Sequence, residues 1–416
     1  MNRPESTLQI HRRRLNNIKN FIIVFTTLAL LIGLLTSFVT SQTPWQLNRY
    51  IPSVVEESHL KQKWVNEILL PSGLGSIDDN GQITGWIHTK TSGTVLKVQA
   101  DQTFQSSTSI ILKEYSLFVY ADSSKQVWLH RGQKSLSAYG ETSNVLWEQR
   151  FATWAENAWA SDDGYILVST KENDTDWAIT LFDASGNLLW KYNTTKQIIV
   201  DAKIATQGKS VLLTTRTQQA PAMTEFSLIN PYGLLLDHLS MPVATTHSTA
   251  IHPNGVLATV SADQYLYSLE DPAKKTLSTS SMLPSATSTE SEESQSSIQL
   301  PAPITKLVYS DKNNSVVAAC WDEINKTGFL TYLDRGTQLL WSEPLRQKLL
   351  VLGVHPSGYA IYGGSNGEVF TYTNQGTLIW KHGVTENNLI DLAFSASGEF
   401  VAGLDQTGKL ILWQIP

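Results

Sequence analysis

The chain has 416 residues, a formal net charge of −6 and a composition that is 41% hydrophobic, so it holds enough apolar material for a large core. A nucleic-acid-binding protein normally carries a basic face, and the acidic balance argues against that class of function. Cys320 is the single cysteine, which excludes a disulfide within the chain. Because it stands in the apolar run SVVAACW, we predict a buried small side chain rather than a reactive thiol.

An apolar segment near the N-terminus has the length of a membrane span. Residues 21–39 carry no charge, and nineteen residues in a helix cover about 28 Å of the roughly 30 Å hydrocarbon core. The basic residues before it are Arg3, Arg12, Arg13, Arg14 and Lys19, and the next one along the chain is Arg49. The positive-inside rule then predicts a cytoplasmic tail over 1–20, a signal-anchor helix over 21–40 and a remainder outside the cytoplasm, either periplasmic or extracellular.

Cleavage after this segment is the alternative. Val39-Thr40-Ser41 has the small residues of a signal-peptide cleavage site. The basic region is about 20 residues long, however, and the apolar run exceeds the usual 7–15 residues of a signal peptide. We therefore favour an uncleaved single-pass membrane protein of the cell envelope, with residues 41–60 as a tether.

A repeat begins after the tether. Tryptophans that end short apolar runs alternate with glycines that close polar turns, at separations of 17 or 18 residues. The pairs are Trp64 and Gly81, Trp147 and Gly164, Trp190 and Gly208, Trp341 and Gly358, and Trp380 and Gly398. A period of about 40–45 residues made of short strands and turns is typical of a β-propeller. We expect an all-β propeller over residues 61–416.

The turns between the first and second strands of each blade give the number of blades. We expect them at Asn80-Gly81, near Glu114–Ser116, and at Gly164, Gly208, Gly255, Asn313-Asn314, Gly358 and Gly398. These turns predict an eight-bladed β-propeller, although the second turn lacks glycine and is displaced from the period. A seven-bladed ring closed by residues 83–90 is the alternative.

The two ends of this domain complement each other. Residues 389–413 supply three strand-like runs, whereas Lys63–Asn66 carry the tryptophan of a fourth strand with no first three before it. Placing the N-terminal strand beside the C-terminal three closes the ring and removes an open sheet edge. The 17 residues between Trp64 and Gly81 match the repeat and support this closure.

Residues 278–302 interrupt the period. The segment is rich in serine and threonine, contains three glutamates and has few large apolar residues. Such a composition buries too little surface to offset the entropy of ordering. We predict a disordered insert between the fifth and sixth blades.

One repeat carries a family resemblance. The run from Asp183 to Trp190, DASGNLLW, resembles the D-x-x-G-x-x-x-W repeats of PQQ-like propellers, and Asn374–Trp380 is similar. The final run GKLILW looks equally like a WD40 repeat. The resemblance covers roughly residues 61–416 and implies a PQQ-like or WD40-like propeller. That superfamily includes quinoprotein dehydrogenases, envelope scaffolds of the BamB type and many other envelope propellers.

The dehydrogenase branch of this superfamily implies chemistry that the chain does not supply. The resemblance would require a calcium site of Glu, Asn and Asp residues, a catalytic Asp and often a disulfide over the quinone. One cysteine cannot form that disulfide, and no acidic residue matches the metal ligands by motif. We therefore expect no enzyme activity, no cofactor, and no catalytic, cofactor-binding or metal-binding residues.

Two further patterns have structural explanations. The motifs His252–Gly255 and His355–Gly358 fall at equivalent places in two blades, so we predict that each histidine caps a turn rather than binding a metal. The pairs Asp78-Asp79 and Asp162-Asp163 precede turn glycines, where aspartate is favoured by turn geometry alone. The repeated tryptophans are expected to pack between blades rather than to stack on a ligand.

These observations favour one function and leave a second open. We expect a membrane-anchored extracytoplasmic propeller that binds protein partners as a scaffold, because loops on a rigid ring suit recognition. It would contact the membrane through residues 21–39 and would bind no nucleic acid. The alternative is a small-molecule or glycan binder, or a hydrolase, at the central funnel, which convergent carboxylates would favour.

Overall fold

The computed structural model describes residues 61–66, 72–89, 92–112, 115–122, 124–131, 134–272, 297–310, 315–335, 338–383 and 387–415. The chain divides into two compact units, Met1–Val54 and Val55–Pro416, and every described residue belongs to the second. The predicted cytoplasmic tail, membrane segment and tether therefore lie outside the described residues. Within the described part, no helix has the length and apolar character that a membrane crossing needs.

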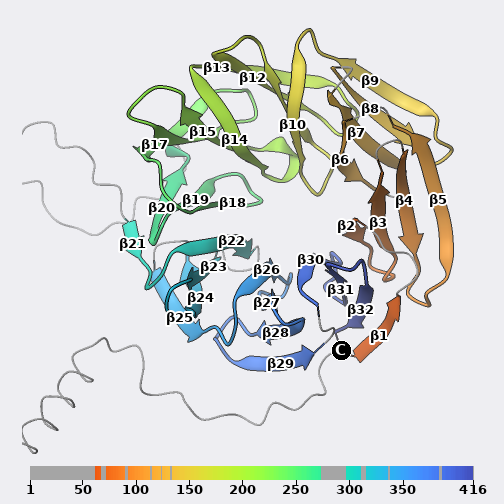
Figure 1. Ribbon diagram of the computed structural model, residues 1–416, viewed down its shortest axis with the longest axis vertical. Coiled ribbons are helices and arrows are strands. Elements are labelled where there is room, and N and C mark those ends of the chain that lie inside the picture. Colours follow the sequence, from red (N-terminus) through yellow and green to blue (C-terminus); the bar gives the residue numbers. More distant parts are fainter. Residues whose placement is uncertain are drawn as a thin grey trace, which may run out of the picture. The chain divides into compact units, whose positions relative to one another are not determined.

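The second unit is a ring of eight antiparallel sheets with four strands each, arranged around a common centre (Figure 1). This confirms the all-β, eight-bladed propeller and excludes the seven-bladed alternative. We call the strands of a blade a, b, c and d, from the centre of the ring to its rim. In seven blades this is also the order along the chain.

The first four blades follow one another without interruption. Blade 1 contains β2 (Gly73–Ile77), β3 (Ile83–His88), β4 (Ser92–Val98) and β5 (Phe104–Ile111). Blade 2 contains β6 (Ser116–Ala121), β7 (Lys125–His130), β8 (Ser135–Gly140) and β9 (Val145–Arg150). Blade 3 contains β10 (Trp154–Ala160), β11 (Ile166–Lys171), β12 (Asp176–Phe182) and β13 (Leu188–Thr195). Blade 4 contains β14 (Gln197–Ile204), β15 (Val211–Thr217), β16 (Met223–Ile229) and β17 (Leu235–Pro242).

The remaining four blades complete the ring. Blade 5 contains β18 (His247–Ile251), β19 (Leu257–Ala262), β20 (Tyr265–Glu270) and β21 (Ser297–Gln299). Blade 6 contains β22 (Ile304–Ser310), β23 (Ser315–Asp322), β24 (Thr327–Asp334) and β25 (Gln338–Pro344). Blade 7 contains β26 (Leu349–Val354), β27 (Ala360–Gly364), β28 (Glu368–Tyr372) and β29 (Leu378–Gly383). Blade 8 contains β30 (Leu389–Phe394), β31 (Phe400–Asp405), β32 (Leu410–Gln414) and, from the other end of the domain, β1 (Lys61–Asn66).

Blade 8 shows how the ring closes. Strand β1 pairs antiparallel with β32, so that Lys61 lies opposite Gln414 and Trp64 lies opposite Leu412. The first and last described strands lie side by side in Figure 1. The predicted closure, with Trp64 on strand d of the final blade, is therefore confirmed.

The a–b turn of blade 2 differs from the prediction. It lies after Ala121 rather than near Glu114–Ser116, and Ser116 is the first residue of strand β6. Asp122 builds this turn by accepting backbone N–H bonds through Oδ1, from Ser124 at 2.6 Å and from Lys125 at 2.9 Å. An aspartate turn of this kind needs no glycine, which is why a search for glycines placed it wrongly.

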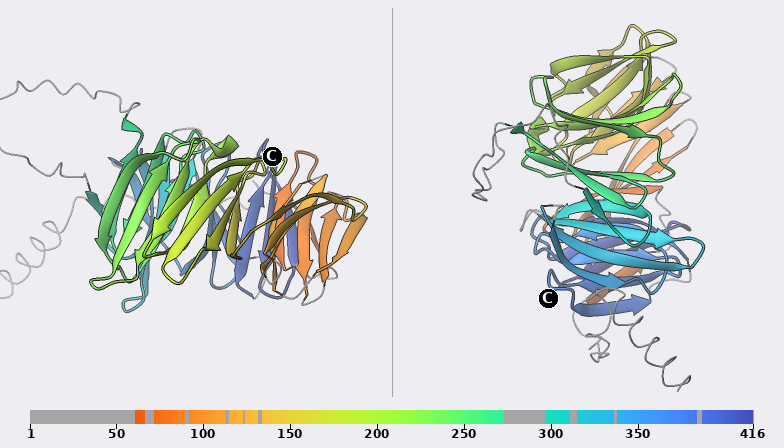
Figure 2. Two further views of the ribbon diagram at one scale, coloured as in Figure 1. Left: turned by 90° about the horizontal axis from the view of Figure 1, so that it is seen from above. Right: turned by 90° about the vertical axis from the view of Figure 1, so that its left-hand side faces the viewer.

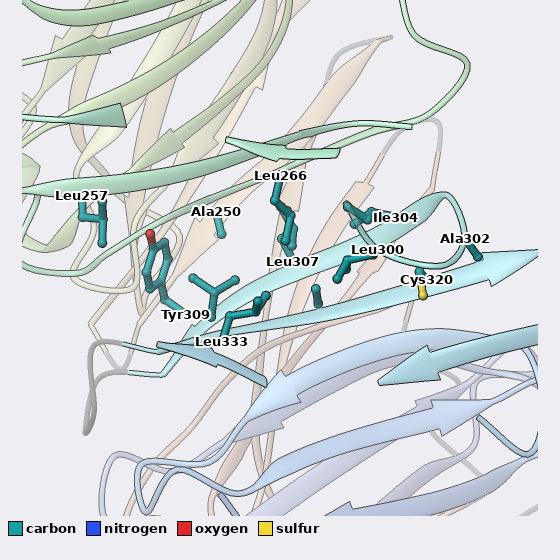
Figure 3. Packing of buried hydrophobic residues seen from close by; sticks show 12 residues of the cluster. Ala250, Leu257, Leu266, Leu300, Ala302, Ile304, Leu307, Tyr309, Cys320 and Leu333 are labelled. Atoms are coloured by element: carbon teal, nitrogen blue, oxygen red, sulfur yellow. The ribbon is translucent and has the colours of Figure 1, made fainter. Parts of the chain in front are cut away.

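The end of the predicted insert is also corrected. Residues 297–302 are not part of a disordered segment, because strand β21 pairs with β20 and completes blade 5. Leu300 and Ala302, next along the chain, are only 5% and 4% exposed and pack between blades 5 and 6 (Figure 3). The insert therefore joins strands c and d within blade 5 instead of joining two blades. The serine-rich composition hid the alternating apolar residues Ile298, Leu300 and Ala302.

The core consists of apolar layers between successive blades. Cys320 belongs to the layer between blades 5 and 6 and is fully buried (Figure 3). Its thiol donates to the carbonyl oxygen of Phe329 at 3.6 Å, and burial raises its pKa to about 11. The prediction of an inert buried cysteine is confirmed, because the thiolate needed for reaction is disfavoured.

Candidate binding face

The strands cross the thickness of the ring, so their connections collect on two faces (Figure 2). We call the face with the a–b and c–d turns the turn face, and the face with the b–c turns and d–a connections the mouth face. Strand β1 begins at Lys61 and strand β32 ends at Gln414, and these two residues are paired. The described chain therefore enters and leaves the ring on the turn face.

On the turn face, tryptophans lock neighbouring blades together. A Cβ atom added to Gly186, in the c–d turn of blade 3, would lie 2.6 Å from Cδ2 of Trp147 in blade 2. The same relation joins Gly376 to Trp341, whose indole Nε1 donates to the carbonyl oxygen of Asn374 at 2.9 Å. The D-x-x-G-x-x-x-W repeat thus places the indole of each such tryptophan against the c–d glycine of the following blade. Packing of these tryptophans between blades is confirmed.

The first aspartate pair also belongs to the architecture of this face. Asp78 Oδ1 accepts the backbone N–H bonds of Asn80 and Gln82 within its own turn. Asp79 Oδ1 accepts the N–H of Ser397 at 2.6 Å, which connects blade 1 to blade 8. This bond lowers the pKa of Asp79 below its usual value of 3.8.

The second pair acts in the same way. Asp163 accepts the hydroxyl of Ser161 at 2.5 Å and the backbone N–H of Gln207, in blade 4, at 2.6 Å. The carbonyl oxygen of Asp162 accepts the hydroxyl of Tyr120, in blade 2, at 3.3 Å. Each pair therefore builds a turn and bridges blades, as turn chemistry predicts.

The two histidine motifs cap turns as predicted. His252 Nδ1 accepts the N–H of Asn254 at 3.0 Å, and His355 Nδ1 accepts the N–H of Ser357 at 2.9 Å. Because Nδ1 accepts, the proton of His355 lies on Nε2, which donates to the carbonyl oxygen of Gly398 in blade 8. Among the described residues, no three His, Cys, Asp or Glu side chains gather where they could hold a metal ion.

Two aspartates on inner strands bear on the alternative of chemistry at the central funnel. Asp391 on β30 accepts the N–H of Leu74, in blade 1, at 3.1 Å, and burial raises its pKa. Asp201 on β14 accepts the hydroxyl of Thr249, in blade 5, at 3.2 Å. Each carboxylate therefore joins its own blade to the next one.

The mouth face carries a groove between blades 2 and 3. It has a volume of about 290 Å³ and is lined by Tyr115, Arg131, Trp154, Ala155 and Glu156. Tyr115 is 75% exposed and Trp154 is 56% exposed. Exposed tyrosine and tryptophan beside arginine is the composition found at the energetic centres of protein interfaces.

Polar contacts hold the sides of this groove. Arg131 Nη2 donates to Asn157 Oδ1 at 2.6 Å, which connects the b–c end of blade 2 to strand a of blade 3. Lys134 Nζ lies 5.9 Å from the centroid of the Trp154 ring and donates to the carbonyl oxygen of Ala152 at 3.0 Å. Lys134 therefore supports the exposed indole, and Arg131 is held beside it by Asn157.

Sequence reasoning did not identify this groove. Trp154 falls outside the spacing of tryptophan and glycine, but so do Trp86, Trp128 and other tryptophans, so the spacing does not single it out.

Comparison of the sequence with protein-family models and with curated proteins finds no match. Comparison of the fold finds propellers. The structure is similar to BamB from Moraxella catarrhalis, with a TM-score of 0.50 and 15% identity over 85% of this chain and 99% of that one. It is similar to the Dos1 propeller, with a TM-score of 0.56 and 11% identity over 85% and 95% of the two chains.

A third similar structure is Sqt1 from Chaetomium thermophilum, with a TM-score of 0.57 and 12% identity over 86% of this chain and all of that one. The fold is thus that of a β-propeller, as the repeats predicted. Identities this low describe the architecture, and the function has to be argued from the surface.

Proposed function

We propose that this protein is a single-pass membrane protein whose propeller lies outside the cytoplasm and binds protein partners in the cell envelope. The observation that carries the binding role is the mouth-face groove, where Tyr115 and Trp154 are exposed beside Arg131. Large rigid rings that remain in water in the free protein are available to a partner at little cost in side-chain entropy.

The way the chain enters the ring supports this arrangement. A tether that precedes Lys61 joins the ring on the turn face, and the mouth face is left for the partner. The uncharged run 21–39 and the basic residues before it support the membrane anchor and the orientation. The similarity to BamB, Dos1 and Sqt1 is consistent with a propeller that works as a scaffold.

Two measurements test the proposal. A reporter enzyme that is active only outside the cytoplasm should work when fused after Pro416, and activity of a cytoplasm-only reporter there would contradict the location. Proteins captured with the intact membrane-bound protein should be lost from the double variant Tyr115→Ala/Trp154→Ala. The variant Tyr232→Ala changes an equally exposed ring on the turn face and should retain them. Equal capture by all three proteins would contradict binding at the mouth face.

A further inference from the structure

We propose that the groove between blades 2 and 3 binds a peptide segment in which a carboxylate neighbours an aromatic or large aliphatic side chain. The inference rests on the proposed function, because the peptide belongs to the protein that the mouth face holds. It goes further by naming the chemistry of the segment and the residues that recognise it.

The backbone at Tyr115 indicates that its ring is kept for a purpose other than stability. Tyr115 has a φ of +66° and lies in the left-handed region, which disfavours every residue with a bulky side chain. Lys196, at the corresponding place before strand a of blade 4, has a φ of +58°. Two blades therefore share this conformation before strand a, and glycine would adopt it with less strain. A ring that is 75% exposed gains little from packing in return.

Strand a of blade 3 differs from its counterparts where it meets the groove. Seven of the described inner strands contain one extra residue, and in blade 3 that residue is Glu156. The extra residues of the other six strands are uncharged: Gly75, Val119, Val200, Thr305, Leu350 and Ile390. Bulges of this kind redirect a side chain and are common beside functional sites.

Trp154 is also found only on this strand among the seven that contain a bulge. It stands two residues before the bulge, where the other six strands have Gly73, Leu117, Ile198, Pro303, Lys348 and Asn388. No other blade with a bulge therefore places an aromatic side chain at this position. Trp154 and Glu156 together make the groove a local feature added to a repeated scaffold.

The charges of the groove select the ligand. Arg131 and Lys134 supply two positive charges against the single carboxylate of Glu156, although the whole chain carries a net charge of −6. Asn157 fixes the guanidinium of Arg131, and a planar guanidinium binds a carboxylate through two parallel hydrogen bonds. Tyr115 and Trp154 supply apolar surface for a neighbouring side chain, and Glu156 can accept an N–H from the peptide backbone.

The experiment measures binding of labelled peptides to the full-length protein in detergent by fluorescence anisotropy. The probe is a fluorescein-labelled hexapeptide that alternates glutamate with phenylalanine, and its matched controls replace either glutamate by lysine or phenylalanine by alanine. We expect binding of the first peptide and binding at least about tenfold weaker for both controls. Arg131→Gln and Trp154→Ala should each weaken the first peptide by about tenfold or more.

Two further variants separate recognition from folding. Tyr115→Gly should weaken the peptide to a similar extent while the melting temperature stays unchanged or rises, because glycine relieves the left-handed backbone. Ile198 stands in blade 4 at the position that Trp154 has in blade 3, and it is 41% exposed. Ile198→Ala should leave binding unchanged. Equal binding of the lysine peptide, or an equal loss with Ile198→Ala, would overturn the inference.

One outcome distinguishes this inference from the proposed function. If no peptide binds, but proteins captured with the membrane-bound chain are still lost from Tyr115→Ala/Trp154→Ala, the mouth face binds a partner of other chemistry. The scaffold role would then stand, and the acidic, aromatic segment would be wrong. If that capture is also unaffected by the double variant, both proposals fail.

Discussion

The two faces of the ring use similar residue types in opposite ways. On the turn face, tryptophans such as Trp341 lie under a neighbouring glycine, and Asp79, Asp163 and His355 bond to the backbone of the next blade. On the mouth face, Trp154 is 56% exposed, with Lys134 near its ring and Arg131 lining the same groove. The aspartates and histidines of the turn face, which could take part in catalysis or metal binding elsewhere, here hold neighbouring blades together. We therefore propose that recognition takes place on the mouth face.

The same contrast explains why motifs that resemble catalytic or metal sites have structural roles on the turn face. Aspartate pairs and histidines near glycines resemble catalytic or metal motifs when they are considered alone. Their partners are backbone groups of adjacent blades. Asp79 bonds to Ser397 and His355 bonds to Gly398, so two different side chains make the same kind of bond between blades. Each such contact ties two blades together at the same edge of the ring.

The largest expected effect comes from opening the ring on the turn face. A chain that begins at residue 75 lacks β1 and leaves the edge of β32 unpaired, so it should lose cooperative unfolding and aggregate. Trp64→Ala should lower the free energy of unfolding by about 3–5 kcal/mol, because Trp64 stands where the other blades bury a tryptophan. Thermal and urea unfolding measure both effects. Trp45→Ala lies outside the repeat and should melt like the parent, whereas a parental melt for Trp64→Ala would contradict the closure.

A tryptophan lock in the middle of the ring should be nearly as sensitive. Trp341 is 8% exposed and contacts Gly376 of the next blade, so Trp341→Ala should lower the free energy of unfolding by about 3–5 kcal/mol. Trp154→Ala, on the mouth face, should change it by less than about 0.5 kcal/mol. Urea unfolding followed by circular dichroism compares the two. A similar loss in both variants would show that the faces do not differ as described.

The hydrogen bond between Asp79 and Ser397 predicts a dependence on pH. The bond lowers the pKa of Asp79, so the folded state favours the carboxylate, and its contribution is present above the usual value of 3.8. The contribution is lost as the pH falls through the lower pKa of the folded state. Asp79→Asn should therefore be less stable than the parent at pH 7, and the difference should shrink below about pH 4. A difference that is independent of pH would show that the charge has no part in the contact.

The smallest effect is expected from the insert of blade 5. Deleting residues 276–294 retains Glu270 and Ser297, which end and begin the strands of this hairpin, and shortens the connection between them. Loop-closure entropy varies slowly with length, so the free energy of unfolding should change by about 1 kcal/mol or less, in the direction of greater stability. Differential scanning calorimetry measures this change. Loss of the cooperative transition would show that the insert contributes to the core.

The fold was predictable because the repeat reports contacts between blades. The spacing of tryptophan and glycine marks strand d of one blade and the a–b turn of the next, and together with the remaining turns it predicted the blade number and the closure by β1. The exceptions lie where different residues do the same task, as Asp122 does in the turn of blade 2. Short strands within a biased composition, such as β21, were also missed.

The groove could not be predicted in the same way. Tyr115, Arg131 and Trp154 come from three separate parts of the chain, and only the ring brings them together. Their distances along the chain carry no period, and each residue alone is unremarkable at a protein surface. Trp154 is out of register with the repeat, but so are buried tryptophans such as Trp128 and Trp413, and the sequence does not distinguish them. Sites built between repeats are therefore less visible in a sequence than the repeats themselves.

The central claim is that the partner binds the mouth face. It is tested most directly by photo-crosslinking in the intact membrane, with benzoylphenylalanine in place of either Tyr115 or Tyr232. Both side chains are strongly exposed, at 75% and 80%, but Tyr115 lies on the mouth face and Tyr232 in a c–d turn of the turn face. We predict one discrete crosslinked product from position 115, removed by Arg131→Gln, and none from position 232. The same product from position 232 alone, or from both positions equally, would contradict the account.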